Sequence, residues 1–412
     1  MTLKNEAINT RRYYIFILVF YLFVFVTAIE KIFPLMKYLD ELYAVLAIPL
    51  FVLELKEKNG KIIWRKYSSV GWIVLFCLMG IISSMIYRYQ PIVKTMLPDL
   101  LLNIKFWLSI YVSYSLFGNM NLDFFGKKIG LHIKIIVCIF VMLILGDSFI
   151  KEIFPGYIRY GFKSVELFYG HPTTFAAICV FLLALLCLLK QKVKNYQLFI
   201  ITLCIFITLT MRSKAFGGII LFVGLYYMVF IRNKKINLGT MITIGIGCVI
   251  AVWGQLQFFF LGATAEGSAR RKLLETSFII AKDHFPLGSG FGTFASYFST
   301  VAYSPLYSNY GISHIQGLSQ KNTNFASDSF WPMIIAQTGY LGLLFYCMAI
   351  LMLFKRIQKV RLADKNKYFA AMFSFSYLLI SSIAEAAFVH PIAIPLAIVI
   401  GISLKNNDKE LI

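Results

Sequence analysis

The chain has 412 residues, of which 59% are hydrophobic and only 14% are charged. A soluble domain carries about 25% charged residues, so the composition excludes an ordinary soluble protein and indicates a polytopic membrane protein. The formal net charge is +21. Because Lys and Arg mark the cytoplasmic loops of membrane proteins, we do not read this charge as a sign of nucleic-acid binding, and no nucleic-acid partner is expected.

Apolar runs recur along nearly the whole sequence. In lipid only helices and closed barrels satisfy the backbone, and continuous apolar runs favour helices over alternating strands. We therefore expect an all-α fold of about twelve transmembrane helices in a single integral membrane domain, residues 1–412. The first run lacks a small-residue cleavage site and is expected to remain as an anchor. The expected spans are 13–29, 39–55, 69–87, 98–117, 129–149, 172–189, 196–210, 215–231, 238–261, 330–354, 368–388 and 391–404.

Basic residues orient these spans. If the N-terminus is cytoplasmic, the inside segments hold more Lys and Arg than the outside segments, although the outside includes the longest loop. This bias is typical of cytoplasmic segments, so both termini are expected inside. The seven cysteines all fall within expected spans, which argues against a disulfide framework or a cysteine metal site.

A polar stretch, residues 262–329, interrupts the apolar pattern between the ninth and tenth spans and is expected to form one large outer loop. Its first part, 268–284, is expected to be helical, with Ser268 as N-cap and Arg271 paired with Glu275 one turn on. The glycines that follow predict a tight turn rather than a phosphate nest, since no Walker pattern is present. The apolar side of the helix, expected to lie on the bilayer, comprises Leu273, Leu274, Phe278, Ile279 and Ile280.

Basic residues on the outer side run against the usual bias and need a reason. Three clusters that converge on one face would suit a polyanion near the membrane surface, because the planar fork of Arg donates two parallel hydrogen bonds to phosphate. The alternative for each is a side chain that snorkels to lipid headgroups, and this alternative stays open. The clusters are Arg159, Lys163, Glu166 and His171; Arg212 and Lys214; and Arg270, Arg271 and Lys272.

Several further residues on the outer side are candidates. Aromatic rings with polar tips suit sugars and the membrane interface equally well, and both readings stay open for Tyr303, Tyr307 and Tyr310. Asp328 opens the tenth span, where it serves either as a helix cap or in the site. Glu385, near His390, is a secondary candidate because ionisable groups within the membrane usually face a cavity or a partner. No His pair has metal-ligand spacing, so no metal site is expected.

Four ordered segments resemble the bacterial O-antigen polymerase and ligase superfamily. That family has a Thr/Ser-x-Arg turn before a span, a loop Arg about 18 residues before a glycine turn, and a Gly-x-x-Gly in the closing span. Here Gly288 follows Arg270 by 18 residues, with Arg271 as the near alternative, and Gly339 and Gly342 match the closing span. The segments are GHPTTFA (170–176), TLTMRSKAFGGI (208–219), ARRKLLETSFIIAKDHFPLGSGFGTF (269–294) and SDSFWPMIIAQTGYLGLLFY (327–346).

This resemblance implies a GT-C-like inverting membrane glycosyltransferase of the bacterial inner membrane. Such an enzyme moves a growing glycan from undecaprenyl pyrophosphate to an acceptor on the periplasmic face, and needs neither nucleotide sugar nor metal; no cofactor is implied. The implied partners are the undecaprenyl-pyrophosphate-linked oligosaccharide, membrane lipids and a protein that regulates chain length.

The resemblance also implies roles for particular residues. Developing negative charge on the leaving group calls for cationic partners, and the acceptor hydroxyl calls for a general base. Tyr303, Tyr307, Tyr310 and Trp331 are the expected sugar contacts. The base candidates are Asp328, then His314, then Glu166, and the expected pyrophosphate ligands are Arg212 with Arg270 or Arg271, together with Arg159 and His171.

One departure separates the two branches of the family. Ligases typically carry a His-Asn-like motif before the closing span, whereas this chain has Ser327-Asp328-Ser329, and its Asp-x-x-Trp form (Asp328, Trp331) is more like repeat-unit polymerases. The first expectation is therefore a polymerase of a lipid-linked repeat unit. The alternatives are the related ligase, which transfers the glycan to a lipid A core, and a flippase or transporter of the lipid-linked oligosaccharide. Paired halves broken by Gly and Pro, typical of secondary transporters, are absent from the sequence.

Overall fold

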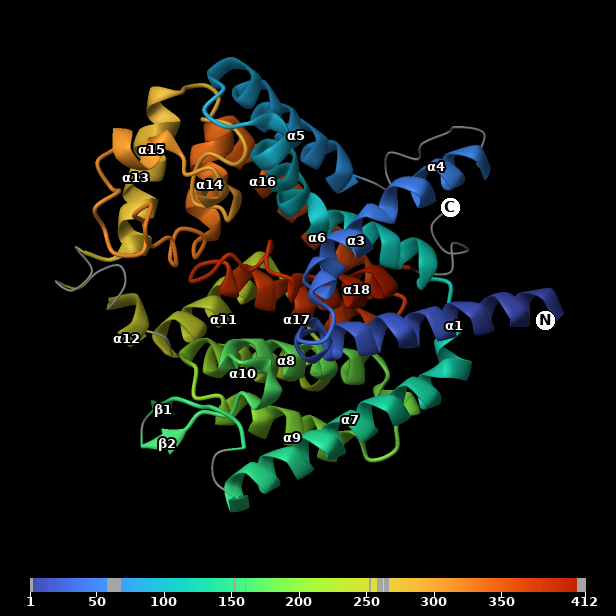
Figure 1. Cartoon of the computed structure of the whole chain (residues 1–412). Helices are drawn as coiled ribbons and strands as arrows, with labels where there is room; N and C mark the ends of the chain where they lie inside the picture. Colours follow the sequence, from blue (N-terminus) through green and yellow to red (C-terminus); the bar gives the residue numbers. More distant parts are fainter. Residues whose placement is uncertain are drawn as a thin grey trace.

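The computed structural model describes residues 3–57, 68–150, 153–159, 161–251, 253–257, 262 and 267–405. The described part is helical, with one short hairpin (Figure 1), and this confirms the expected fold class of a helical membrane protein. Three parts of the expectation lie outside the described residues: most of the basic segment between the second and third spans (58–67), the end of the ninth span (258–261) and the start of the outer loop (263–266).

Helices form in each of the expected spans, although α1 begins ten residues before its span and α17 ends seven residues before the end of its span. The spans 13–29 and 39–55 each divide into two helices, and 238–261 holds one helix on either side of residue 252, which the structure does not describe. The helices in the expected spans are α1 (Leu3–Val24), α2 (Val26–Glu30), α3 (Leu39–Val45), α4 (Ala47–Glu57), α5 (Ser68–Tyr87), α6 (Leu97–Leu116), α7 (Leu122–Ile150), α8 (Pro172–Leu188), α9 (Tyr196–Leu209), α10 (Ser213–Tyr226), α11 (Leu238–Ala251), α12 (Trp253–Leu256), α16 (Phe330–Val360), α17 (Lys365–Ser381) and α18 (Ala393–Leu404).

Shorter elements connect these helices. The outer loop contains α13 (Ala269–Asp283), α14 (Phe298–Val301) and α15 (Pro305–Asn309), and the hairpin between α7 and α8 consists of β1 (Ile158–Arg159) and antiparallel β2 (Phe162–Lys163). Single turns of 3-10 or π helix complete the set: η1 (Pro34–Tyr38), η3 (Ile92–Met96), η4 (Leu167–Tyr169), η5 (Lys190–Lys192) and η6 (Tyr227–Ile231).

The break between α3 and α4 has a local cause. Pro49 lies in the first turn of α4, where its missing N–H costs nothing. Further inside a helix its ring would clash with the carbonyl four residues back, which is that of Val45, the last residue of α3. The apolar run at 39–55 therefore forms two helices that change direction at Leu46.

Three helices form the centre of the bundle. Nearly every side chain of α8 and α17 is buried, and so is every side chain of α18, as expected for helices that are apolar on all sides. The outer helices instead expose large apolar side chains, such as Met142 and Phe149 on α7, which are 72% and 85% exposed. Among the residues that the structure describes, five helices are long and apolar enough to cross a membrane: Ala7–Val24, Ser69–Tyr87, Leu122–Ile150, Ser213–Ile231 and Phe330–Val360.

The start of the described chain lies on the side of the molecule away from the outer loop (Figure 1). In that view the start of α1 is on the right, whereas α13 and the β1–β2 hairpin are on the left.

The glycine turn of the outer loop is buried between helices rather than spread on the membrane surface. Residues 288–296 are all buried, and they lie between α5, α6 and α16. Their backbone N–H groups donate to these helices: Gly288 to Ser83 Oγ, Phe291 to Ser84 Oγ, Gly292 to Asp99 Oδ2, Ser289 to the Ala336 carbonyl and Gly290 to the Gln337 carbonyl. Because these amides are already used, the turn is not a phosphate nest, in agreement with the sequence.

Two glycines make this insertion possible. Gly290 has a φ of +100°, and a Cβ there would lie 2.5–2.8 Å from Ser84. Gly339 interrupts α16 with a φ of +67°, and a Cβ there would lie 2.1 Å from the Leu287 carbonyl oxygen. The kink in α16 and the turn of the loop therefore fit each other, backbone against backbone.

The expectation that the apolar side of the 268–284 helix lies on the bilayer is wrong in part. The helix forms as expected, with Ser268 at its N-cap position. Leu273 and Ile280, however, are fully buried in the protein core, and α13 packs against α16. Only the other part of the apolar side, including Phe278 and Ile279, stays exposed at 45% and 50%.

We expect Gly290→Ala to destabilise the protein by about 2–4 kcal/mol, since it adds a methyl group against Ser84 and forces an unfavourable φ. The measurement is thermal unfolding in detergent. Gly311→Ala is the matched control, because Gly311 also has a positive φ but open space around it, so it should cost only about 1 kcal/mol. Equal losses would mean that the close packing of the turn does not matter.

Candidate functional site

Three connections bring the ends of α8, α9 and α10 together. The Val165 N–H donates to the Leu209 carbonyl at 3.0 Å, which ties the segment after the hairpin to the end of α9. A tight turn through Met211, whose φ is +49°, then reverses the chain into α10. As a result Glu166, His171 and Arg212 lie beside one another, although up to 46 residues separate them in sequence.

His171 and Arg212 are in direct contact. His171 is the N-cap of α8 and accepts a weak hydrogen bond from the Thr173 N–H at its Nδ1, at 3.3 Å. Arg212 Nη2 lies 2.9 Å from its Nε2. Partial burial and the positive charge of Arg212 lower the pKa of His171 to about 4, so the ring is neutral at pH 7. A neutral imidazole has only one acceptor nitrogen. The ring can therefore accept from the Thr173 N–H or from Arg212 but not from both, and one of these two donors is left unsatisfied.

Glu166 adds a buried carboxylate to this pair. The residue is only 3% exposed, and neither its Oε2 nor the Nε of Arg212 has a hydrogen-bond partner. Burial raises the pKa of Glu166, while the charges of Arg212 and Lys163 oppose that shift. Buried polar atoms without partners are uncommon in native proteins. Here the charge of Glu166 acts on Arg212, whose Nε leaves donor capacity for a ligand.

The outer loop contributes an ion pair from its two ends. Arg270, in the first turn of α13, donates from Nη2 to Asp328 Oδ2 at 3.1 Å, and Asp328 directly precedes α16. Arg271 instead pairs with Glu275 on its own helix at 2.7 Å, as the sequence predicts. Of the two candidate loop arginines, the structure therefore directs Arg270 toward the other charged residues.

A further ion pair lies within the bundle. Lys214, in the first turn of α10, donates to Glu385 in the segment between α17 and α18. The charges of Arg212 and Arg270 both act on Lys214, and those of Arg270 and His390 act on Glu385. Part of each basic cluster of the outer side therefore belongs to one set of interacting charges. We call the set His171, Arg212, Lys214 and Arg270 with Glu166, Asp328 and Glu385 the charged site.

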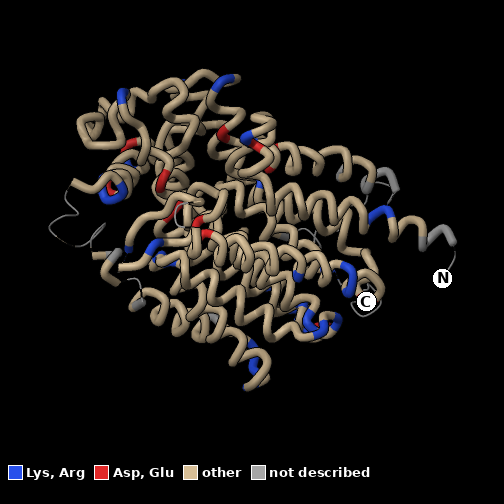
Figure 2. Tube along the Cα trace, turned by 60° about the horizontal axis from the view of Figure 1, so that its bottom comes forward, with Lys and Arg blue, Asp and Glu red and all other residues tan. Residues whose placement is uncertain are grey.

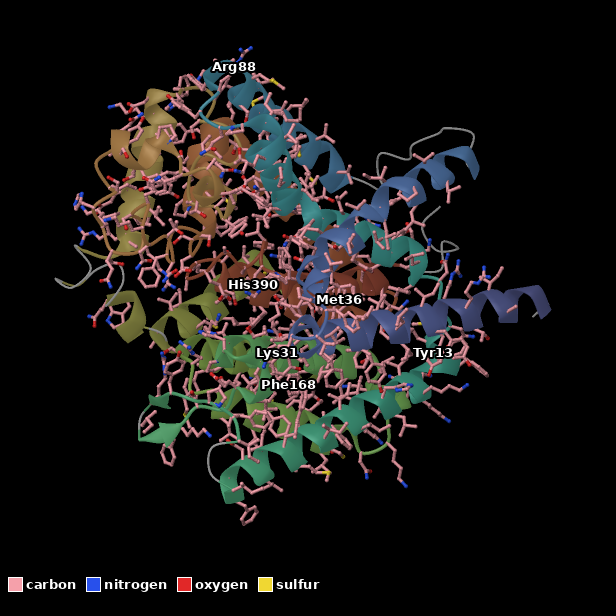
Figure 3. The ribbon with its side chains drawn as sticks, viewed as in Figure 1. Tyr13, Lys31, Met36, Arg88, Phe168 and His390 are labelled. Carbon is pink, nitrogen blue, oxygen red and sulfur yellow. The ribbon has the colours of Figure 1, made fainter. Side chains whose placement is uncertain are left out.

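The figures show how this site is placed. Acidic and basic positions lie close together between the loop helices and the rest of the bundle (Figure 2), while long stretches of the helices carry no charge. His390 is labelled near the centre of the view in Figure 3, and its side chain is exposed.

Helix ends add to the positive potential of the site. His171 caps α8, Arg212 is the N-cap of α10 and Asp328 lies just before α16. Unpaired N–H groups and the aligned peptide dipoles make a helix N-terminus attractive to anions. The arrangement is therefore suited to an extended anionic group held by guanidinium groups and helix ends together.

Other candidates lie outside the charged site or at its edge. Arg159 is partly exposed on β1, and its charge acts on Arg212 without direct contact. Lys163 pairs with Asp147 of α7 at 2.9 Å, and Lys272 pairs with Glu275 at 3.1 Å. His314 is exposed in the outer loop, and no contact brings it to the charged site.

The aromatic candidates make most of their contacts within the outer loop. Tyr307 has no exposed surface; its ring stacks on Phe294 and Tyr303, and its hydroxyl accepts from the Ala295 N–H. The expectation that Tyr307 contacts sugar is therefore wrong for this structure, because the loop needs the ring as core. Tyr303, Tyr310 and Trp331 stay partly exposed and donate to the Leu318 carbonyl, Asp283 Oδ2 and Ser382 Oγ, respectively.

The sequence interpretation missed a buried charge cluster in the bundle. Lys105 of α6 is 1% exposed and donates to Asp40 and to Glu41 of α3, the latter at 3.2 Å. Its charge acts on His390, next to the charged site. Lys105 within an apolar span was the available signal, because a lysine in lipid needs an acidic partner. The acidic partners, Asp40 and Glu41, lie in the short second span, and no sequence spacing connects them to Lys105.

We expect Glu385→Ala to lower the stability by about 3 kcal/mol, because it leaves the Lys214 ammonium without its carboxylate in a largely apolar setting. Thermal unfolding in detergent measures the loss. The double variant Lys214→Met with Glu385→Leu removes both charges and should recover most of it. If the double variant is no more stable than Glu385→Ala, the ion pair is not the cause.

Comparison with known proteins does not place the chain in a family. The sequence matches no protein-family model, and no curated protein matches it. The resemblance of the four segments to O-antigen polymerases and ligases therefore remains an expectation. The chemistry of the charged site has to be inferred from the residues themselves.

Proposed function

We propose that this protein is a membrane glycosyltransferase that polymerises undecaprenyl-pyrophosphate-linked oligosaccharide repeat units. The observation that carries this proposal is the convergence of Arg212 and Arg270, from two distant parts of the sequence, on one charged site beside Lys214 and three helix N-termini. A pyrophosphate is a compact polyanion, and bidentate Arg is the side chain best suited to it. The charged site and the four resembling segments point to the same residues.

In this proposal the cationic groups hold the donor pyrophosphate. Arg212 has an unpartnered Nε, and its Nη2 faces Nε2 of His171 while the Thr173 N–H faces Nδ1 of the same neutral ring. Binding a phosphate oxygen would therefore improve the hydrogen bonding of Arg212. Neutral His171 can then turn a ring N–H toward the same anion. As the anomeric C1–O bond of the donor breaks, the oxygen retains the electron pair, and the fixed guanidinium groups stabilise that charge.

A carboxylate is proposed to take the proton of the acceptor hydroxyl. Asp328 is the first candidate; without a ligand its Oδ2 accepts a hydrogen bond from Arg270. A pyrophosphate that competes for Arg270 frees the Asp328 oxygen, so binding of the donor activates the base. The hydroxyl oxygen then attacks the anomeric carbon opposite the leaving pyrophosphate, with inversion. Glu166 and His314 remain the second candidates.

The proposal includes an orientation. The loop helix α13 and the β1–β2 hairpin lie on the side away from the start of α1 (Figure 1), and basic residues are in excess in the segments expected on the other side. We therefore place the termini in the cytoplasm and the outer loop in the periplasm of a bacterial inner membrane. There the lipid-linked substrate is reached from the outer leaflet, with a chain-length regulator as a further partner.

A strain lacking the gene tests the reaction class. We expect surface glycans truncated to a single repeat unit on the lipid carrier or core, visible as loss of the ladder on a glycan gel and restored by a plasmid copy. Full-length polymer stranded on undecaprenyl pyrophosphate would instead indicate the ligase. Repeat units trapped in the cytoplasmic leaflet would indicate the flippase.

Arginine variants test the charged site. We expect Arg212→Ala and Arg270→Ala to abolish polymer, at least a hundredfold loss, because each removes a bidentate phosphate ligand worth about 3 kcal/mol. Arg212→Lys should rescue poorly, since an ammonium cannot replace the planar fork. Polymer length and yield on a glycan gel measure both effects.

Arg271→Ala is the matched control, because Arg271 lies next to Arg270 but pairs with Glu275 on the helix surface. It should leave polymer within about twofold of the original chain, as expected for an exposed ion pair. Membrane levels of each variant, from a blot of an epitope-tagged chain, separate lost activity from lost protein. Normal polymer from Arg270→Ala, or loss with Arg271→Ala alone, would contradict the assignment.

A further inference from the structure

A cavity of about 320 Å³ lies between α4, α5, α6, α16 and α18. Its size falls in the ~300–1,000 Å³ range of small-molecule sites. Its wall is almost entirely aliphatic and aromatic, with Trp107, Tyr111 and Tyr114 supplied by α6. Such a wall offers few partners to a polar ligand and is suited to hydrocarbon.

The cavity is open to the side of the bundle between α4 and α5. Four of its lining residues are large aliphatic side chains that remain exposed: Ile48 at 60%, Val52 at 46%, Val70 at 41% and Val74 at 51%. The inner wall is buried, with Ile110 at 8% and Tyr114 at 6% exposure. A chain lying in the membrane can therefore enter sideways between these helices.

Positive charge is concentrated at one end of the cavity. Arg356 lines it directly, and its guanidinium carbon lies 5.0 Å from the centre of the Tyr114 ring. Lys405, directly after α18, places its ammonium 4.5 Å from the same ring. Two cations thus flank one buried aromatic ring where the apolar wall ends, which is the charge pattern of a site for an amphiphile with an anionic head.

This cavity is separate from the charged site. Along α5 it is lined by the first turns, Ser69 to Cys77, whereas the far end of α5 binds the glycine turn. Along α16 it is lined by Leu353 and Arg356, whereas the start of that helix follows Asp328. The cavity and the charged site therefore lie at opposite ends of α16.

We propose that this cavity is a binding site for an anionic phospholipid, with an acyl chain between α4 and α5 and the phosphate at Arg356 and Lys405. The occupant is a phospholipid and not the tail of a substrate held at the charged site, because the cations at the cavity call for a headgroup at that end. Burial of the acyl chain against α4 and α5 joins two helices that otherwise expose aliphatic side chains toward each other. The site is independent of the proposed glycosyltransferase activity.

The test uses the full chain purified in a mild detergent with dioleoyl phosphatidylglycerol as the probe and dioleoyl phosphatidylcholine as the comparison lipid. We expect the anionic lipid to raise the thermal midpoint in a saturable way, as a ligand of the native state does, and the neutral lipid to have little effect. Native mass spectrometry should detect one retained phospholipid. Equal stabilisation by both lipids, or a retained polyprenyl phosphate instead, would overturn the proposal.

Variants assign the binding to this cavity. Arg356→Gln should raise the phosphatidylglycerol concentration for half-maximal stabilisation about tenfold, and Val74→Trp should remove the effect by filling the opening. Lys359→Gln is the matched control, since Lys359 is exposed on the same helix and does not line the cavity. If Arg356→Gln fails to fold, Lys405→Gln takes its place. Unchanged lipid dependence in both the cation variant and Val74→Trp would reject the site.

Discussion

The insertion of the glycine turn between α5 and α16 is the constraint on which the rest of the structure depends. Loop residues that are anchored by five backbone hydrogen bonds to the bundle cannot drift on the membrane surface. The start of α13, which carries Arg270, and the segment before α16, which carries Asp328, are thereby fixed over the ends of α8 and α10. Without this anchor, residues from two distant parts of the chain would have no reason to share one site.

The cations of the charged site differ in how completely their charges are paired. Arg270 and Lys214 each have a carboxylate partner, whereas Arg212 contacts a neutral histidine and retains an unpartnered nitrogen. In the site without a ligand, the carboxylate partners of Arg270 and Lys214 reduce the repulsion among the cations. Arg212, which is incompletely hydrogen-bonded, can donate to an incoming anion without first breaking an ion pair.

Much of the helical framework was predictable, because long apolar runs leave the backbone no alternative in lipid. The helix at 268–284 and the Arg271–Glu275 pair were predictable for the same local reason, since both depend on residues one turn apart. The choice of Arg270 over Arg271 was not, because it depends on where Asp328 lies after the loop has folded. Tyr307 was misassigned since a tyrosine in a polar loop gives no sign that its ring is the core of that loop. The Lys105 cluster needed contacts between α3 and α6, which no sequence spacing reveals.

The interruption of α16 at Gly339 lets the loop approach the bundle closely. The helical turns before the kink are bonded to the loop through the Ala336 and Gln337 carbonyls, and the same loop residues are bonded to α5 and α6 through Ser83, Ser84 and Asp99. Trp331, three residues after Asp328, donates to Ser382 Oγ at the end of α17. The spacing between Arg270 on the loop and Arg212 on the bundle is thus set by uncharged contacts that lie away from both guanidinium groups.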